Sequence, residues 1–200
     1  MAGTVMNTEE VMAELEKDEI YYRNSKGGVT FSGGEPLLQR DFVRELVIAS
    51  KERGYHTAID TAGNVPWTAF EAILPYTDLF LFDVKTFDEG KHRQATGASN
   101  RQILQNLERL ADSQVPITIR VPVIPGVNDD LVEMEAIASL LRGLHGIGLV
   151  ELLPFHHLGA NKYESLDKAY RSKGFTPPSA ELMDRLVETF TSRGLNAQRP

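Results

Sequence analysis

The chain has 200 residues, of which 42% are hydrophobic and 24% charged, and its formal net charge is −7. This acidic composition, without a run of Lys or Arg, argues against nucleic acid or an anionic membrane surface as a partner. No apolar stretch approaches the roughly 20 residues of a membrane span, and the N-terminus does not resemble a signal peptide. We therefore expect one cytoplasmic domain over residues 1–200.

The first half of the chain alternates short strands with amphipathic helices. Asn7 and Glu10 have the spacing of a capping box, which predicts a first helix. Apolar patterns and turn residues then predict a strand over residues 29–32, a helix ending at Gly54, a strand over 57–60, a helix over 67–74 and a strand over 78–85.

The second half continues this alternation after a predicted loop. Strands are expected over residues 117–124 and 149–153, with helices before, between and after them. Candidate capping residues precede the three helices: Ser99 with Gln102, Asp130 with Glu133, and Ser179.

Strict alternation of strand and helix predicts an α/β fold with a parallel sheet. The five predicted strands are too few for an eight-stranded barrel. The chain also begins with a helix, whereas a βα architecture normally begins with a strand. We therefore expect that a strand is missing upstream.

Ligands of parallel α/β folds bind at the carboxyl ends of the strands, where the sequence places several polar residues. Gly33 and Gly34 follow the first predicted strand and allow a ligand to approach the backbone closely, or else form a tight turn before a helix. Glu35 could accept hydrogen bonds from a ligand ammonium group, or lie at a helix N-terminus.

Two carboxylates, Asp60 and Asp83, end neighbouring predicted strands. Such a pair suits a cation or an ammonium group, although a single Asp at this position is commonly a helix cap. Lys85 lies two residues after Asp83 and hence on the same face, where it could form a structural ion pair or bind a ligand.

Arg120 lies within the strand predicted over residues 117–124, which we expect to be buried on both faces. A buried arginine requires a partner, and a carboxylate of the protein or of a ligand is the natural candidate. His156 follows the last predicted strand, and a lone histidine there is usually structural. No two histidines have convincing metal-ligand spacing.

Taken together, these motifs closely resemble the pyruvate formate-lyase activating enzyme family of radical S-adenosylmethionine (SAM) enzymes. The resemblance covers the chain from Gly27 to the C-terminus, and the motifs occur in the family's order. The matching segments are Gly28–Gln39, Asp60–Gly63, Phe82–Lys85, Arg120–Asp129 and Glu151–His156.

The resemblance implies a partial parallel (β/α) barrel of the radical SAM type, with the five strands here as strands two to six. It also implies SAM as cofactor and a glycyl radical enzyme as partner. The residues that match the family's SAM contacts are Gly33, Gly34, Glu35, Asp83, Val84, Lys85, Arg120 and His156, and those that match its monovalent-cation site are Asp60 and Thr61.

In such enzymes a 4Fe–4S cluster reductively cleaves SAM, and the resulting radical abstracts hydrogen from a glycine of the partner. The family holds this cluster with three cysteines in a loop after the first strand. The present chain has no cysteine at all, so it cannot bind the cluster alone. We therefore expect an N-terminally truncated chain that lacks the first strand and the cluster loop, and that is an inactive fragment as it stands.

Two alternatives remain open. The first is a non-catalytic half-protein that binds SAM, docks to a glycyl radical enzyme or pairs with a separate cluster-bearing segment. The second is a cluster-free barrel enzyme that uses Asp60, Asp83, Lys85 and His156 for acid–base or metal chemistry.

Overall fold

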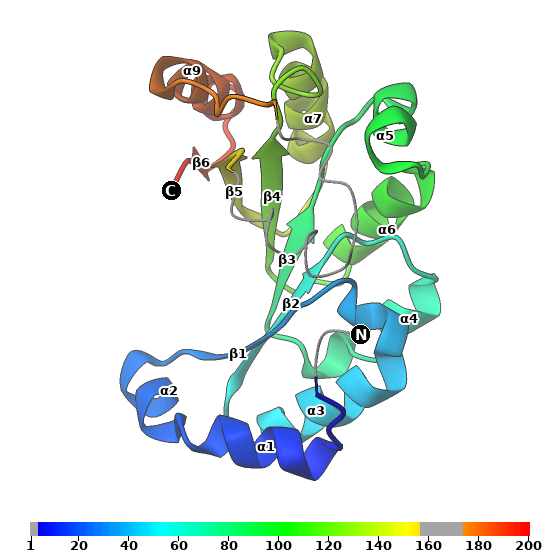
Figure 1. Ribbon diagram of the computed structural model, residues 1–200, viewed down its shortest axis with the longest axis vertical. Coiled ribbons are helices and arrows are strands. Elements are labelled where there is room, and N and C mark those ends of the chain that lie inside the picture. Colours follow the sequence, from blue (N-terminus) through cyan, green and yellow to red (C-terminus); the bar gives the residue numbers. More distant parts are fainter. Residues whose placement is uncertain (1–3, 157–173) are drawn as a thin grey trace.

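The computed structural model describes residues 4–156 and 174–200 and contains one parallel sheet of six strands (Figure 1). The strands follow chain order, from β1 to β6, and every neighbouring pair is parallel. This confirms the predicted α/β class and the open, partial barrel. The strands are β1 (Gly28–Phe31), β2 (His56–Thr61), β3 (Leu79–Asp83), β4 (Ile117–Val123), β5 (Ile147–Pro154) and β6 (Ala197–Gln198).

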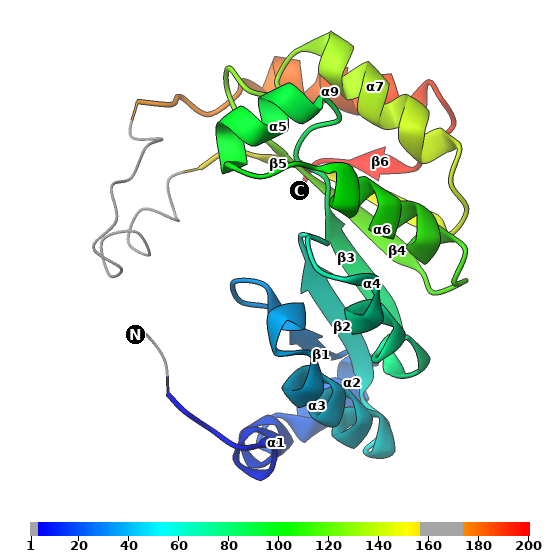
Figure 2. The ribbon, with the colours of Figure 1, turned by 90° about the vertical axis from the view of Figure 1, so that its right-hand side faces the viewer.

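Helices connect the successive strands, as the alternation predicted. Figure 2 shows α3, α4, α6 and α7 on the same side of the sheet, while α1 and α2 lie near its β1 end. The helices are α1 (Thr8–Glu16), α2 (Glu19–Ser25), α3 (Arg40–Glu52), α4 (Trp67–Glu71), α5 (Glu89–Thr96), α6 (Arg101–Ala111), α7 (Leu131–Arg142) and α9 (Ala180–Thr191), with short 3-10 turns η1 (Pro36–Gln39) and η2 (Leu74–Tyr76).

Within the described ranges, the helices cover one face of the sheet (Figure 2). Along β4, Ile117, Ile119 and Val121 are fully buried beneath the helices, whereas the intervening Thr118 and Arg120 are half-buried on the opposite face. The prediction that this strand is buried on both faces was therefore wrong. Apolar residues at every second position are enough to bury one face, and the other face is the open side of the partial barrel.

Most of the predicted helix caps are present. The capping box of Asn7 and Glu10 is complete, with both hydrogen bonds formed. Asp130 and Ser179 accept hydrogen bonds from the first turns of α7 and α9. Glu133, however, does not complete a box with Asp130, because its carboxylate accepts hydrogen bonds from the N–H groups of the turn at residues 87–88.

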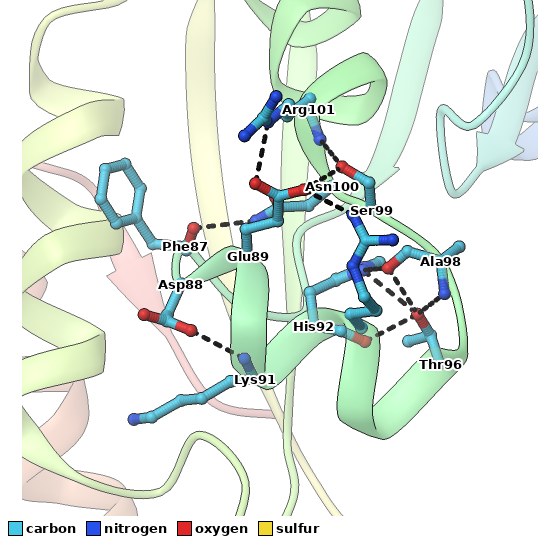
Figure 3. Close-up of polar contacts among 11 residues, drawn as sticks. Phe87, Asp88, Glu89, Lys91, His92, Thr96, Ala98, Ser99, Asn100 and Arg101 are labelled. Atoms are coloured by element: carbon cyan, nitrogen blue, oxygen red, sulfur yellow. Dashed lines mark hydrogen bonds and ion pairs between the residues drawn. The ribbon is translucent and has the colours of Figure 1, made fainter.

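The segment between β3 and α6 differs from the prediction. Residues 89–96 form helix α5 instead of a loop, and Ser99 does not cap α6 through a capping box with Gln102. Ser99 instead donates a hydrogen bond to Glu89 over 2.9 Å and accepts one from the N–H of Arg101 (Figure 3). The position before α6 is taken by Asn100, whose side chain is turned back to the carbonyls of residues 86 and 87.

Candidate functional site

The charged residues of the predicted site lie side by side across the open face of the sheet. Asp83 of β3 is in register with Arg120 of β4, which is in register with Glu151 of β5. Asp60 of β2 is in register with Leu81, two residues before Asp83 and on the same face. The side chains of the four charged residues are 22–28% exposed, so they line the face without being sealed from solvent.

Arg120 bridges two carboxylates from different strands. Its Nη1 atom lies 3.3 Å from Oδ2 of Asp60, and its Nε atom lies 3.4 Å from Oε2 of Glu151. Ser32, which directly follows β1, donates a hydrogen bond to the same Oδ2 of Asp60 over 2.9 Å. The expected carboxylate partner of Arg120 is thus supplied by the protein, and twice over.

Asp83 and Lys85 form the ion pair that the sequence allowed. Nζ of Lys85 lies 2.7 Å from Oδ2 of Asp83, and both side chains are about 30% exposed (28% and 31%). The other carboxylate oxygen of Asp83 has no hydrogen-bond donor within the described part of the chain. The pair therefore leaves Asp83 with an acceptor that a ligand can use.

The main chain of Lys85 is hydrogen-bonded to Asn128, a fully buried residue whose role the sequence did not indicate. The Asn128 amide donates to the carbonyls of Lys85 and Pro122 over 2.6 and 2.8 Å, and its oxygen accepts from the N–H of Ile124 over 2.7 Å. Asn128 lies in a segment that the sequence had singled out, but only the tertiary structure shows that it joins two loops at the strand tips.

The two glycines after β1 are exposed and differ in what they require. Gly33 has φ +143, a backbone conformation that side-chain-bearing residues rarely adopt, so the turn itself needs glycine there. Gly34 has no such constraint, and a Cβ atom added to it would meet nothing within 4 Å. Nothing in the described chain requires glycine at position 34, which favours the close approach of a ligand.

Glu35 is already bound by protein donors. Its carboxylate accepts hydrogen bonds from the Thr61 hydroxyl over 2.8 and 2.9 Å, from the N–H of Ala62 over 3.0 Å and from the N–H of Leu37 over 3.2 Å. Glu35 therefore fastens the glycine turn to the end of β2. Thr61 is buried, at 2% exposure, and lies on the opposite face of β2 from Asp60, so the two side chains do not converge on one cation site.

Two further predicted residues lie at the edge of this arrangement. Val84 is 1% exposed, so its side chain belongs to the core, and its N–H donates to the carbonyl of Arg120 over 2.9 Å. A ligand can reach Val84 only through the remaining main-chain groups. His156 is exposed, two residues beyond β5.

A small cavity of about 200 Å³ adjoins Asp83 and Lys85 and reaches α5. Its inner wall includes His92, which is 3% exposed and whose Nδ1 lies 2.8 Å from the carbonyl oxygen of Ala98 (Figure 3). Because that oxygen can only accept, Nδ1 must be the donor in this contact. The sequence did not single out His92, because it lies in a segment with almost no apolar residues.

Comparison with known proteins shows the family of this chain. A family model described as the Radical SAM superfamily matches residues 2–138. The chain is 36% identical over 184 residues to the pyruvate formate-lyase-activating enzyme of Clostridium pasteurianum, covering 92% of this chain and 77% of that protein. The chain belongs to the radical SAM superfamily, among the glycyl radical enzyme activating enzymes.

Other relatives are similar to this radical SAM chain over most of its length. The (2S)-3-sulfopropanediol dehydratase activating enzyme of Klebsiella oxytoca is 41% identical over 97% of the chain, which spans 63% of that protein's length. The crystal structure of a domain of the pyruvate-formate lyase-activating enzyme from Bacteroides vulgatus superposes with a TM-score of 0.75 at 30% identity, covering 87% of this chain and 99% of that domain.

Family membership implies SAM and a 4Fe–4S cluster as cofactors. The cluster does not fit the residues of this radical SAM chain, because the 200 residues include no cysteine. The described residues also contain no group of three or more His, Asp or Glu placed to hold a metal ion. Among the described helices, none has the length and apolar character needed to cross a membrane.

Proposed function

We propose that this chain forms the SAM-binding part of a glycyl radical enzyme activating enzyme of the pyruvate formate-lyase type. One observation carries the proposal: an open glycine, Gly34, lies two residues after Ser32, which is hydrogen-bonded to the acid-rich row on the face of the radical SAM sheet opposite the helices. SAM has a sulfonium and an ammonium group but only one carboxylate. A site in which carboxylates outnumber basic groups therefore suits it.

The charges at the strand tips fit this ligand. Asp60, Asp83 and Glu151 provide three carboxylates, whereas Arg120 and Lys85 provide two positive charges. Glu35 is not included among these carboxylates, because Thr61 and Ala62 at the end of β2 already donate hydrogen bonds to it.

Each part of the site has a distinct role in this proposal. The unpaired oxygen of Asp83 accepts a hydrogen bond from the methionyl ammonium, and the main chain at Gly34 lies against the same group. Lys85 forms an ion pair with the methionyl carboxylate. A cluster held by residues outside this chain would supply the electron that cleaves SAM. The open face of the sheet holds the sulfonium in one orientation, and Glu35 and Asn128 keep the two binding loops in place.

The cluster ligands must come from outside these 200 residues. We therefore propose that the chain binds SAM but cannot cleave it, and that cleavage requires a separate cluster-bearing segment. A glycyl radical enzyme is the proposed macromolecular partner. Its identity stays open, because the names of the relatives cover dehydratases, lyases and a decarboxylase.

The test has two parts. Calorimetric titration with millimolar SAM is expected to show binding to the wild-type chain and a large loss in Asp83→Ala. Absence of heat with the wild-type chain contradicts the proposed SAM binding. Anaerobic reconstitution with iron and sulfide is expected to give no cluster absorbance, and a stable 4Fe–4S spectrum would refute the requirement for an external segment.

The lack of cysteine also favours one second candidate, a non-catalytic half-protein that binds SAM or docks to a glycyl radical enzyme without any cluster-bearing partner. The two proposals differ in an assay with a separately supplied peptide that carries the cysteine loop. Formation of 5′-deoxyadenosine on adding the reconstituted peptide and a reductant supports the activating enzyme. SAM binding without any product in this mixture supports the half-protein.

A further inference from the structure

Glu151 was not among the site residues predicted from the sequence, but its side chain contacts Arg120, which was. It lies on β5 in register with Arg120, its side chain is 22% exposed, and its Oε2 atom contacts Nε of Arg120 over 3.4 Å. Its second oxygen, Oε1, lies 3.5 Å from Nε2 of Gln198 on β6. Glu151 thus connects Arg120 to the last strand of the sheet.

Arg120 is in register with two carboxylates, Asp83 on β3 and Glu151 on β5, but of these it contacts only Glu151. Its direct cross-strand neighbour on β3 is Asp83, and opposite charges directly across a parallel pair normally attract. The guanidinium instead contacts Asp60, which lies two strands away, and Glu151, which lies on the other side. Arg120 is held between these two carboxylates, so the free oxygen of Asp83 is left without a guanidinium partner.

We propose that Glu151 is a positioning residue that keeps Arg120 away from Asp83. Without its carboxylate, Arg120 has only the 3.3 Å contact with Asp60 and can turn toward its in-register neighbour. A guanidinium bound to Asp83 would compete with a cationic ligand for the same carboxylate. This inference rests on the proposed function for its ligand, SAM, but the contact between Glu151 and Arg120 does not depend on any ligand.

The consequence can be tested with a double-mutant cycle of Glu151→Gln and Arg120→Gln, with SAM titrated by calorimetry. Glu151→Gln is expected to weaken SAM binding about tenfold. In the Arg120→Gln background the same change is expected to have no further effect, because no guanidinium remains to compete. A matched control is Glu135→Gln, which removes the same charge and breaks a 3.6 Å contact with Arg193. Glu135 lies on α7 and Arg193 follows α9, so this contact is not part of the row of charged residues on the strands.

Two results of this cycle would overturn the proposal. One is wild-type affinity in Glu151→Gln. The other is an equal loss of affinity with and without Arg120, which would mean that Glu151 acts through its charge alone and not through the guanidinium.

A second measurement needs no SAM, so it separates this inference from the proposed function. The Nε–H signal of Arg120 in a nitrogen-15 NMR spectrum is assigned by its loss in Arg120→Gln. Glu151→Gln is expected to shift this signal and to speed its hydrogen exchange several-fold, while Glu135→Gln leaves it unchanged. If the wild-type chain fails to bind SAM but the signal responds, the proposed function fails and the positioning role stands. An unchanged signal in Glu151→Gln refutes the positioning role.

Discussion

Substituting Gly34→Ala adds one methyl group at the exposed tip of the loop between β1 and η1. In the folded chain this methyl group meets no atom within 4 Å, and the backbone conformation of Gly34 is one that alanine can adopt. The fold should therefore tolerate the change and gain about 0.4–1 kcal/mol from the smaller entropy of the unfolded chain. A bound ligand that touches this backbone would instead be pushed away.

The neighbouring glycine gives the opposite expectation. Gly33 has φ +143, so Gly33→Ala forces a side chain into a strained conformation that costs of the order of 1–3 kcal/mol. For a domain of this size each kcal/mol lowers the melting temperature by roughly 2–4 °C. Thermal unfolding should thus distinguish the two variants even though they are adjacent.

For SAM binding, crowding a well-packed contact by one methyl group costs about 1–3 kcal/mol. This corresponds to a dissociation constant raised roughly 5-fold to 150-fold. Calorimetric titration of Gly34→Ala should show this loss at an unchanged or slightly raised melting temperature. Gly143→Ala is the control, because Gly143 ends α7 with an ordinary φ of −78 and its added Cβ would lie 3.4 Å from the nearest atom. Wild-type SAM affinity in Gly34→Ala would refute the argument that a ligand approaches this backbone.

Three further predictions concern stability. Burial opposes the ionisation of Asp78, but hydrogen bonds from Lys51 and Thr57 outweigh it and hold the pKa of Asp78 below its usual range. The resulting stabilisation is present above the ordinary carboxyl pKa of about 3.9 and is lost as the pH falls through the lower pKa of the folded state. In urea unfolding, Asp78→Asn should therefore be destabilised by about 1–2 kcal/mol at pH 7 and by less below pH 4. Asn128→Ala removes three hydrogen bonds to part-buried main-chain groups and should lower the unfolding free energy by about 2–4 kcal/mol. Tyr55→Phe removes a buried hydroxyl that has no partner in the described chain, and should raise the melting temperature by roughly 2–4 °C.

Each of these predictions has a result that contradicts it. An Asp78→Asn difference that stays constant between pH 7 and pH 3.5 would show that the carboxylate charge is not involved. Asn64→Ala, at an exposed position close to the same strand tips, serves as the control for Asn128→Ala, and equal losses in both would dismiss the buried network. A lower melting temperature in Tyr55→Phe would show that the hydroxyl is hydrogen-bonded in solution.

The sequence predicted the parts of the fold that depend on local patterns. All five expected strands are present, because each is a run of apolar residues between turn signals. The caps at Asn7, Asp130 and Ser179 were found because each bonds to an amide three residues later, a contact that spacing alone can indicate.

The features that the sequence missed depend on contacts between distant segments. Helix α5 buries only His92, so it has no apolar period, and it is held by polar contacts from other elements, such as that between Lys91 and Asp130. Ser99 has the spacing of a cap, but Glu89 competes for its hydroxyl. The bridging of Arg120 to Glu151 could not be foreseen, because it requires the register of β4 and β5.

The same was true of the candidate site as a whole. The sequence identified the residues at the strand tips, and the structure brings Asp60, Asp83 and Arg120 onto one face. It also shows that Glu35 is turned toward Thr61 and that the side chain of Val84 is in the core. These differences arise from the alternation of side chains along each strand, which fixes the face of a residue only when the strand's position in the sheet is known.

The hydrogen bonds of Asn128 and Glu133 have a mechanical consequence. Asn128 ties the segment at Lys85 to the end of β4, and Glu133, on the first turn of α7, holds the turn at residues 87–88 through two main-chain N–H groups. The segment that follows β3 is therefore joined to the segment that follows β4 at two points, Lys85 and the turn at residues 87–88. A displacement of the main chain at Lys85 would therefore have to break the hydrogen bond to Asn128 or shift the segment that leads into α7.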